Sequence, residues 1–563
     1  MPRLSSCIGG CIGSAGAANN PPQPASAAGG GGNSGGGAAE VKAELQPHPV
    51  KEQLPGIQFC VNSPPPWPEA VLLGFQHYIL TLGITVLIPS LLVPQMGGGN
   101  DEKATVIQAQ LFASGVSTLL QTLFGTRLPS VAVGSCAYML PVTSILLGSS
   151  YRSITDPKER FKATMRGVQG AMIIAGCFQI AVGFLGLWRN VARLLTPLSI
   201  APFVTCTGLG LYYLGFPMMA KCIEVGIPAL IAIVFISQHL PSLVGLKRPI
   251  CDRYAVLLSV PLVWLYAQIL TSTGAYNGKP EATQDSCRTD RAGLVSSTPW
   301  IYVPYPFQWG RPTFSAGEVF AMMAASLVTL FESSGAFFAA ARYGSATPVP
   351  PSVLSRGIGW LGLGVLFNGL LGSVTGSSAS VENTGLLAMT RVGSRRVIQV
   401  SACFMIFFSI FGKLGAVFAS IPLPIVAALY CVFCGYAASA GLGFLQFCNL
   451  NSFRTKFVLG FSFFMGISVP QYFREYVMGP QPGHVQGGSR WFKDIPIIIF
   501  MSHATVAALS ALLLDCTLQA RTDSARKDSG THWWEKFNLY WADIRSDDFY
   551  ALPCCLNEFF PSL

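Results

Sequence analysis

The chain has 563 residues, of which 51% are hydrophobic and only 11% are charged, and its mean hydropathy is +0.48. Soluble domains carry about twice that share of charged residues, so this composition excludes a soluble globular protein. The net charge of +10 is better explained by cationic loops beside a membrane than by a nucleic-acid partner. We expect an all-α polytopic membrane protein embedded in the lipid bilayer.

The two ends of the chain differ in composition from its middle. Residues 1–50 are rich in Gly, Ala, Ser and Pro, which predicts a disordered cytoplasmic tail, because such a segment cannot bury a core. Residues 51–515 hold the apolar runs and predict one transmembrane transporter domain. Residues 516–563 are polar but contain "WWEKFNLYW", which predicts a cytoplasmic tail whose aromatic side chains lie at the membrane surface.

Apolar runs recur through the middle of the chain at about the length that crosses a bilayer as a helix. Their boundaries are accurate to about two to four residues. Fourteen candidate spans occupy residues 69–91, 107–124, 129–147, 167–187, 194–214, 226–245, 254–273, 316–341, 356–373, 381–391, 397–418, 423–445, 455–473 and 494–515.

The third and tenth spans are too short or too interrupted to cross a bilayer alone. The third, "RLPSVAVGSCAYMLPV", is bounded by Pro129 and Pro141, and the tenth follows the Gly- and Ser-rich stretch "LGSVTGSS". If fourteen spans form two sets of seven, these two hold the same place in each set. Interrupted spans at matching places of two repeats are typical of a transporter's binding site.

The distribution of cations predicts the orientation of the chain. With the N-terminus inside, the loops on the inner side hold Arg127, Arg189, Arg193, Lys247, Arg248, Arg253, Arg342, Arg356, Arg391, Arg395, Arg396, Arg454 and Lys456. The outer loops are closer to balance, although residues 149–166 hold five cations against Asp156 and Glu159. The positive-inside rule therefore predicts that both termini are cytoplasmic.

Most of the sixteen cysteines lie inside apolar runs and predict packing residues. The spacing of Cys431 and Cys434 is that of a redox motif, but on a buried helix it favours packing. Cys287 is the only cysteine in the long loop before Pro306. No set of Cys and His has the spacing of a zinc site, so we expect no metal.

Polar side chains inside the spans are costly, which makes the few that occur candidates for function. In the first span, Gln76 and His77 either bond neighbouring helices or contact a ligand, and the sequence leaves both open. In the eighth span, Glu332 lies roughly sixteen residues into a helix, where an ionised carboxylate is unfavourable unless it is paired or solvated. Glu332 is therefore a candidate proton acceptor or partner for a ligand N–H, and Gly335 leaves room beside it.

The stretch "SASVENTGLLAMTR" at 378–391 opens the tenth span with an acid and an amide. A helix starting near Ser380 places Glu382 and Asn383 in its first turn, where free N–H groups and the helix dipole stabilise a carboxylate. An ordinary N-cap would explain Ser380. It does not explain a cap at membrane depth, where non-helical backbone is tolerated only inside protein or around a cavity.

These motifs resemble those of the nucleobase–ascorbate transporter family of xanthine/uracil permeases, most closely its plant members. The signature of acid, amide or Pro, then Asn-x-Gly, four residues and Thr-Lys/Arg is matched by Glu382, Asn383, Gly385, Thr390 and Arg391. The family's Gln-His pair and its "ES-x-G" element are matched at 76–77 and 332–335. Plant-like stretches such as "SPPPWPEA" and "VPQMGGGN" extend the similarity over about residues 45–563.

The resemblance implies a fold of seven-plus-seven inverted repeats with a core domain and a gate domain. Members are homodimers that work by an elevator-type motion of core against gate. Spans one, three, eight and ten belong to the core, and the third and tenth contribute half-helices that hold a small-molecule substrate.

The resemblance also implies roles for individual residues. Glu332 and Glu382 would hydrogen-bond the nucleobase, Asn383 would shape the site, and Gln76 and His77 would support it. Tyr138 falls where many members place an aromatic side chain that stacks on the base. Thr390 and Arg391, at the cytoplasmic end of the tenth span, would influence selectivity and gating.

The predicted function is proton symport of nucleobases at the plasma membrane, with oxidised purines such as xanthine and uric acid favoured and no cofactor. Two carboxylates suit ring N–H donors. Within the family, Pro at the position of Glu382 accompanies sodium-coupled ascorbate transport, so the acid argues against ascorbate. An internal membrane remains an alternative because of the unusual N-terminal tail.

Several positions depart from the family pattern and keep other functions open. Asn368 stands where many members have Asp, Ala336 stands where some microbial members have Asp, and the third span has the unusual sequence "VAVGSCAYM". The alternatives are a transporter of ascorbate or another organic anion and a divergent, uncoupled member such as a channel or sensor. We expect no enzyme, because zinc, Ser–His and paired-Asp signatures are missing from the sequence.

Overall fold

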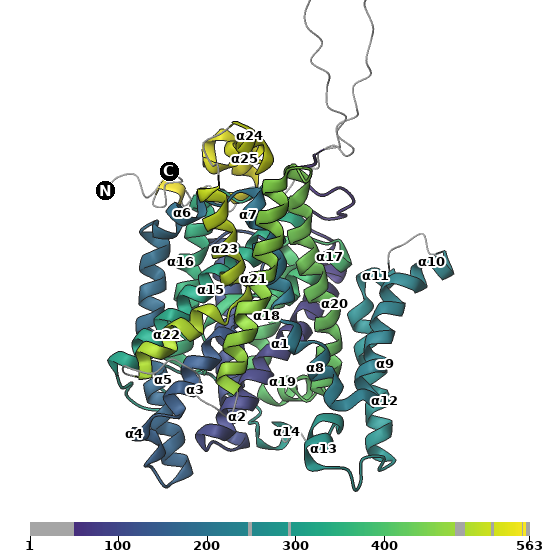
Figure 1. Ribbon diagram of the computed structural model, residues 1–563. Coiled ribbons are helices and arrows are strands. Elements are labelled where there is room, and N and C mark those ends of the chain that lie inside the picture. The colour runs from purple at the N-terminus through teal and green to yellow at the C-terminus, as the bar shows by residue number, and fades with distance from the viewer. Residues whose placement is uncertain are drawn as a thin grey trace, which may run out of the picture.

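The computed structural model describes residues 50–245, 250–290, 294–478, 490–518, 523–553 and 556–558. These residues form a bundle of long helices with two three-residue strands (Figure 1). The predicted helical class is confirmed. The tail predicted over 1–50 lies outside the described residues except for Val50, so its disorder stays a prediction.

In the first half of the bundle, helices begin at residues that favour a helix N-terminus. Its main elements are α1 (Trp67–Met96), α2 (Asn100–Leu123), β1 (Ala132–Gly134), η1 (Cys136–Tyr138), α3 (Met139–Leu146), α5 (Pro157–Phe184), α7 (Pro197–Leu209), α9 (Ile223–Val234) and α12 (Ala255–Ser272). Both α5 and α7 start with proline, which suits the first turn, and are capped by Asp156 and Thr196.

The second half repeats this mixture of long helices and one broken span. Its main elements are α15 (Ala316–Tyr343), α16 (Pro351–Leu371), β2 (Ser377–Ala379), α17 (Val381–Thr390), α18 (Arg395–Ile410), α19 (Gly412–Ala419), α20 (Leu423–Leu442), α21 (Phe453–Met478), α22 (Arg490–Phe500) and α23 (His503–Thr517). Each predicted span overlaps one of these helices or broken units.

The number of membrane crossings is only partly settled by helix length. In the described ranges, seven helical stretches are long and apolar enough to cross a membrane, and the bent pairs α18–α19 and α22–α23 raise this to nine. The chain turns by 110° and 80° at these two bends. The multi-pass character is therefore supported, while the fourteen spans and the inverted repeat stay predictions.

A short strand interrupts the third predicted span near its start, and another directly precedes the tenth. Strand β1 pairs antiparallel with β2, with Ala132 opposite Ala379 and Gly134 opposite Ser377. Beyond the strands, the chain continues into η1 and α3 in one case and into α17 in the other. The predicted interruptions are confirmed, and main-chain hydrogen bonds join segments that lie far apart in the sequence.

The long helices pack in two groups. In one group α5 packs along α16, and α18 packs against α1 and α2; in the other, α7 packs against α20, α21 and α23. Small residues allow the closest approach, since a Cβ on Gly183 would lie 2.2 Å from the amide nitrogen of Gly359. Helices α15 and α17 contact members of both groups. The broken spans therefore lie at the boundary between the groups.

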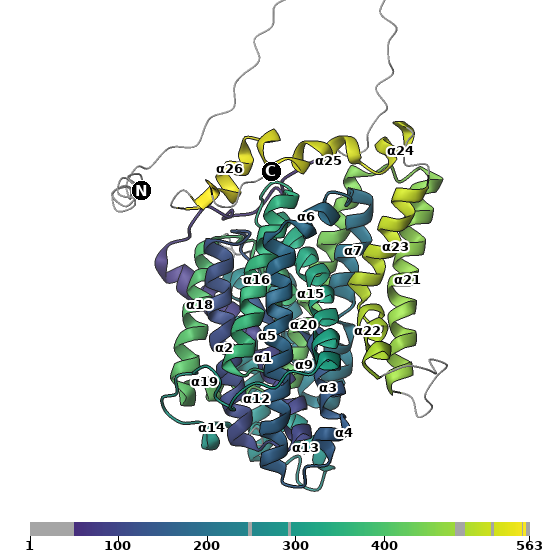
Figure 2. The same cartoon turned by 90° about the vertical axis from the view of Figure 1, so that its left-hand side faces the viewer.

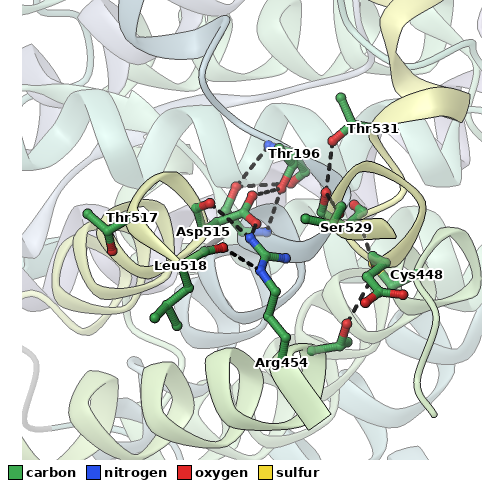
Figure 3. A network of polar contacts seen from close by, with 12 residues as sticks. Thr196, Cys448, Arg454, Asp515, Thr517, Leu518, Ser529 and Thr531 are labelled. Atoms are coloured by element: carbon green, nitrogen blue, oxygen red, sulfur yellow. Dashed lines mark hydrogen bonds and ion pairs between the residues drawn. The ribbon is translucent and has the colours of Figure 1, made fainter. Parts of the chain in front are cut away.

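A buried ion pair ties the ends of α7, α21 and α23 together (Figure 3). An Arg454 guanidinium nitrogen lies 2.6 Å from Asp515 Oδ1, and the two side chains are 10% and 5% exposed. Thr196 donates its hydroxyl to Asp515 Oδ2 at 2.6 Å. Arg454 also donates to the carbonyl of Leu518 at 2.7 Å. The cation predicted for a cytoplasmic loop is thus held inside the second group of helices.

One pair of cysteines forms a bond that the sequence analysis did not predict. Cys287, at the end of α13 (Glu281–Cys287), is disulfide-bonded to Cys222, which ends η3 (Ala220–Cys222). The carboxylate of Glu224 lies beside these sulfurs. Because the two sulfurs are bonded to each other, this group is no metal site. Helix α13 lies at the end of the bundle opposite α24 and α25 (Figure 1).

The C-terminal segment forms a cap across the other end of the bundle, made of α24 (Asp523–Asp528), α25 (Thr531–Asn538) and α26 (Arg545–Tyr550) (Figure 2). Trp534 and Phe537 are buried, and the Trp534 ring contacts Phe338 of α15 and Phe444. The prediction that the tail aromatics lie at the membrane surface is wrong for these two, because they pack onto the protein. Trp541 is exposed.

The described N-terminal residues meet this cap. Glu52 is paired with Lys536 and, at 2.8 Å, with Arg545. Cations predicted for the inner loops also bond the cap, since Arg356 donates to the carbonyl of Tyr550 at 2.9 Å. The start and the end of the described chain therefore share one end of the bundle, together with several of the predicted inner cations.

Candidate functional site

A cavity of about 430 Å³ lies at the boundary between the two groups of helices. One wall is built from β1, β2 and the helices that follow them, together with α15. The facing wall comes from α7, η2 (Tyr212–Leu214), α21 and the α22–α23 bend. Both broken spans thus line a single space, which is the setting in which irregular backbone is tolerated at membrane depth.

The non-helical backbone around the cavity has its hydrogen bonds met inside the protein. The amide of Ser135 donates to the carbonyl of Gly376 at 3.1 Å, and the amide of Ser380 donates to the carbonyl of Val131 at 2.8 Å. The amide of Ala379 donates to the Ser333 hydroxyl at 3.1 Å. Because these donors are satisfied without water, the paired strands form a fixed frame for the side chains they carry.

Glu332 of α15 enters the cavity between the two walls. Its Oε2 accepts a hydrogen bond from the hydroxyl of Ser135, on the strand side, at 3.2 Å. Its Oε1 accepts from the hydroxyl of Ser502, at the α22–α23 bend, also at 3.2 Å. The carboxylate therefore bridges the two groups of helices through two neutral donors.

Glu382 lies in the first turn of α17 and is only 3% exposed. Its Oε2 accepts from the Ser380 hydroxyl at 2.6 Å, while its Oε1 is buried and has no partner among the described residues. The helix N-terminus supplies a favourable field for this carboxylate. Since Glu332 and Glu382 both line the cavity, the structure brings the two predicted acids to one place.

The predicted cap of the tenth span is confirmed in detail. Helix α17 begins after Ser380, whose hydroxyl accepts from the amide of Asn383 at 3.1 Å. Gly385, one turn on, packs so closely that a Cβ would lie 2.1 Å from the carbonyl oxygen of Phe433 in α20. The glycine of the signature is therefore required for the contact between α17 and α20.

Asn383 and His77 form a buried pair behind the cavity wall. His77 Nδ1 lies 2.8 Å from Asn383 Oδ1, and the Asn383 amide nitrogen donates to the hydroxyls of Ser380 and Thr81 at 2.9 and 3.2 Å. Neither residue is among those that line the cavity. Their geometry fits a role in holding α17 against α1.

Four predicted residues lie away from the cavity lining. Gln76 donates to the carbonyl of Arg253 at 2.8 Å. The Tyr138 hydroxyl lies 3.0 Å from Ser326 Oγ, and its ring lies against Gly376, so this side chain offers no face to the cavity in this conformation. Thr390 bonds its own helix, and the exposed Arg391 ends α17 with φ of 56°. Their predicted roles stay predictions.

The facing wall holds residues that the sequence analysis missed. Arg474 of α21 lies over the Tyr213 ring, with its guanidinium carbon 4.1 Å from the ring centroid. His503 of α23 is 8% exposed, and its Nε2 is buried without a partner among the described residues. All three line the cavity. Arg474 was missed because the predicted span ended at residue 473, which left Arg474 in a loop. Helix α21 in fact continues to Met478, and a longer predicted helix would have included the arginine.

The two single positions that depart from the family pattern, Asn368 and Ala336, are both buried. Asn368 is buried and donates to Ser377 Oγ of β2 at 2.9 Å, so an amide rather than a carboxylate supports the strand. Ala336 is buried within α15, beside Gly335, whose Cβ would lie 2.4 Å from Thr207 Oγ1. Neither position lines the cavity.

Comparison with known proteins adds an independent line of evidence. Residues 68–475 match the family model Xan_ur_permease, described as "Permease family". The chain is 63% identical over 532 residues to putative nucleobase-ascorbate transporter 10 of Arabidopsis thaliana, which covers 93% of this chain and 98% of that protein. It is 58% identical over 519 residues to nucleobase-ascorbate transporter 7 of the same plant, covering 92% and 96%.

Among solved structures, the transmembrane domain of a cyanobacterium bicarbonate transporter, BicA, matches with 15% identity and a TM-score of 0.38. The match covers 79% of this chain and 96% of that domain.

Proposed function

Because this chain belongs to the nucleobase–ascorbate transporter family of permeases, we propose that it is a secondary active transporter of nucleobases, with oxidised purines such as xanthine and uric acid preferred. The observation that carries this proposal is the presence of Glu332 and Glu382 on one cavity of about 430 Å³. Small-molecule pockets start at about 300 Å³, so a bicyclic base fits this space. Each carboxylate can accept hydrogen bonds from ring N–H groups of the base.

Proton symport is the proposed mode of coupling, with Glu332 as the proton carrier. Placing an ionisable side chain at membrane depth is unfavourable in free energy, so a residue that occurs there is a candidate for function. The hydroxyls of Ser135 and Ser502 bond Glu332 without supplying a counter-charge. Uptake of a proton together with the base would neutralise the carboxylate for the crossing.

An elevator-type motion is the proposed means of transport. In this proposal α1, the two broken spans and α15 move as the core, and α7, α20, α21 and α23 form the stationary gate. The position of the cavity between these groups supports it. The Ser502–Glu332 hydrogen bond crosses the boundary and would break when the core slides. A homodimer, implied by the family resemblance, would anchor the gate.

The proposed orientation places the C-terminal cap in the cytoplasm and the protein in the plasma membrane. Disulfides persist in oxidising surroundings, so the Cys222–Cys287 bond favours an external position for α13. Because the cap lies at the opposite end of the bundle, it falls on the cytoplasmic side. The predicted cytoplasmic termini are consistent with this assignment.

Ascorbate transport is the second candidate. The similar plant proteins carry ascorbate in their names, and Arg474 adds a cation to the cavity wall. Two carboxylates on the other wall would repel an anion unless they are protonated. Nucleobases therefore come first.

Uptake of radiolabelled xanthine, uric acid, uracil and ascorbate into transport-deficient cells tests the proposal. We expect saturable uptake of the oxidised purines that a protonophore abolishes. Uptake of ascorbate alone would establish the second candidate instead. If purine uptake follows the substrate gradient and is unchanged by the protonophore, the protein conducts nucleobases as a channel and the proposed proton coupling is wrong.

A further inference from the structure

Arg474 is the one lysine or arginine among the cavity-lining residues of the described chain. Helix α21 runs on to Met478, so Arg474 sits in its last turns rather than in a loop. The guanidinium carbon lies 4.1 Å from the ring centroid of Tyr213 and 5.7 Å from that of Tyr212. This stacking stabilises the position of the cation through the ring quadrupole.

The charge of Arg474 has no carboxylate beside it in the part of the chain that the structure describes. The acids of the cavity, Glu332 and Glu382, come from helices of the other wall and accept hydrogen bonds from serine hydroxyls. Glu332 also reaches across the cavity to the hydroxyl of Ser502. The cavity therefore has an acidic wall and a basic wall. A ligand that meets both must carry donors along one edge and acceptors along another.

Two residues that line this space each carry a buried polar atom without a described partner. Glu382 Oε1 is a buried acceptor without a described partner, and His503 Nε2 is a buried ring nitrogen without one. Buried polar atoms normally find a partner, so these two atoms leave unused hydrogen-bonding capacity beside the cavity. His503 lies on the same side as Arg474, next to the ring of Tyr212 at 5.6 Å between centroids.

We propose that Arg474 is a specificity-determining residue that binds the carbonyl oxygens of an oxidised purine from the wall opposite Glu332 and Glu382. The inference rests on the proposed function and names the part of the substrate that the second wall recognises. A guanidinium presents a planar fork of donors, which suits carbonyl oxygens in the plane of a base and also suits a purine anion. The N–H edge of the same base then faces the carboxylates.

The recognition depends on the number of oxygens that the purine carries. Uric acid has three carbonyl oxygens, xanthine has two and hypoxanthine has one, while the purine ring is the same. Uric acid also loses a ring proton more readily than xanthine. Loss of the arginine should therefore cost uric acid and xanthine more affinity than it costs hypoxanthine.

The test measures how the three purines compete with labelled xanthine for uptake by wild type and by Arg474→Gln. We expect the inhibition constants of uric acid and xanthine to rise about tenfold or more, as for loss of a hydrogen bond to a charged group, and that of hypoxanthine to rise less. Arg474→Lys keeps the charge but loses the fork, so it should recover only part of the discrimination.

Arg396→Gln is the matched control, since Arg396 also stacks on an aromatic ring, that of Trp67 at 4.8 Å, but lies outside the cavity lining. It should keep the wild-type order of the three purines. Where a variant reaches the membrane but does not transport, ligand-induced thermal stabilisation of the purified full chain gives the same comparison.

Two results would overturn the inference. Unchanged inhibition constants in Arg474→Gln would show that the arginine does not contact the substrate. An equal loss for all three purines would show that it only supports the wall. Wild type that takes up no purine would instead remove the proposed function, and the wild-type measurement separates this case from the other two.

Discussion

His77 Nδ1 and Asn383 Oδ1 lie 2.8 Å apart, although 306 residues separate them in the chain. Both residues are buried, each only 2% exposed, so the contact is shielded from water. It joins the middle of α1 to the first turn of α17, directly behind Glu382. The position of the helix turn that carries Glu382 therefore depends on a hydrogen bond between two residues outside the cavity lining.

Breaking this pair should weaken both the fold and transport. His77→Ala or Asn383→Ala leaves a buried polar partner, which costs about 1–3 kcal/mol of unfolding free energy. We expect the effects of the two changes on xanthine uptake to be coupled by about 0.5–3 kcal/mol in a double-mutant cycle. Kinetics of uptake for the two single variants and the double variant measure this. Strictly additive losses would contradict the pairing.

Glu332→Gln should abolish uptake or weaken it greatly while the protein still reaches the membrane. An amide can accept a hydrogen bond from one of Ser135 and Ser502 and donate one to the other, but it carries no charge and takes up no proton. Proton-coupled uptake and surface labelling measure the two properties together. Glu318→Gln is the control, because Glu318 lies on the same helix but outside the cavity lining and should transport normally. Wild-type uptake by Glu332→Gln would remove the proposed role.

Glu382→Pro should reduce purine recognition without dismantling α17. Residue 382 is the second residue of the helix, and proline is tolerated in a first turn. The substitution removes the carboxylate that faces the cavity. Competition by xanthine and uric acid against a labelled purine measures the loss. If both purines compete as well as they do against wild type, the placement of Glu382 in the binding site is wrong.

Arg454→Met should destabilise the protein by about 3–5 kcal/mol, because it leaves the Asp515 carboxylate buried and uncompensated. Denaturation of the purified protein in detergent measures the change. Arg526→Met is the matched control, since Arg526 pairs with Glu535 at an exposed site and should cost less than about 1 kcal/mol. Adding Asp515→Leu to Arg454→Met should recover stability. Equal effects of the two arginine changes would contradict the buried pair.

The docking of the C-terminal cap should depend on pH. Burial raises the pKa of Glu52, but hydrogen bonds from Lys536 and Arg545 outweigh it and hold the pKa below its ordinary value. A hydrogen bond from Arg545 likewise lowers the pKa of Asp543. Groups with lowered pKa values stabilise the docked state above the pKa of the free carboxyl, and this stabilisation is lost as the pH falls through the lowered values.

We therefore expect the cap to be protected from proteolysis at neutral pH and to become exposed below about pH 4, near the ordinary pKa of carboxyl groups. Limited proteolysis of the purified protein across this range measures the change. Glu52→Gln should weaken protection at neutral pH and flatten its pH dependence. Protection that stays constant down to pH 3 would contradict the role of these ion pairs.

The sequence was sufficient to predict the helices and the place of the site. A long apolar run predicts a membrane span without knowledge of the helices that pack against it. Ser380 and Glu382 also give a local signal for the start of a helix. Pro129, Pro141 and the Gly/Ser stretch likewise predicted where two spans break. The presence of Glu332 and Glu382 on one cavity also agreed with the expectation from the motifs.

Other features depend on contacts between distant segments and could not be predicted in this way. Pairing of Cys287 with Cys222 requires the spatial position of α13, which hydropathy does not give. Tryptophan is typical of the membrane surface, but Trp534 packs on α15. Tyr138 faces Ser326 rather than the cavity, and Arg474 faces the cavity rather than the solvent, because side-chain direction follows helix packing.

The pairing of β1 with β2 has a consequence for how this family can diversify. The two strands are joined to each other by main-chain hydrogen bonds, which do not depend on the identity of the side chains that the strands present. Substitutions beside the strands can then alter which molecule is accepted while the geometry that presents the two acids persists. Substrate preference can therefore change within the family while the fold stays the same.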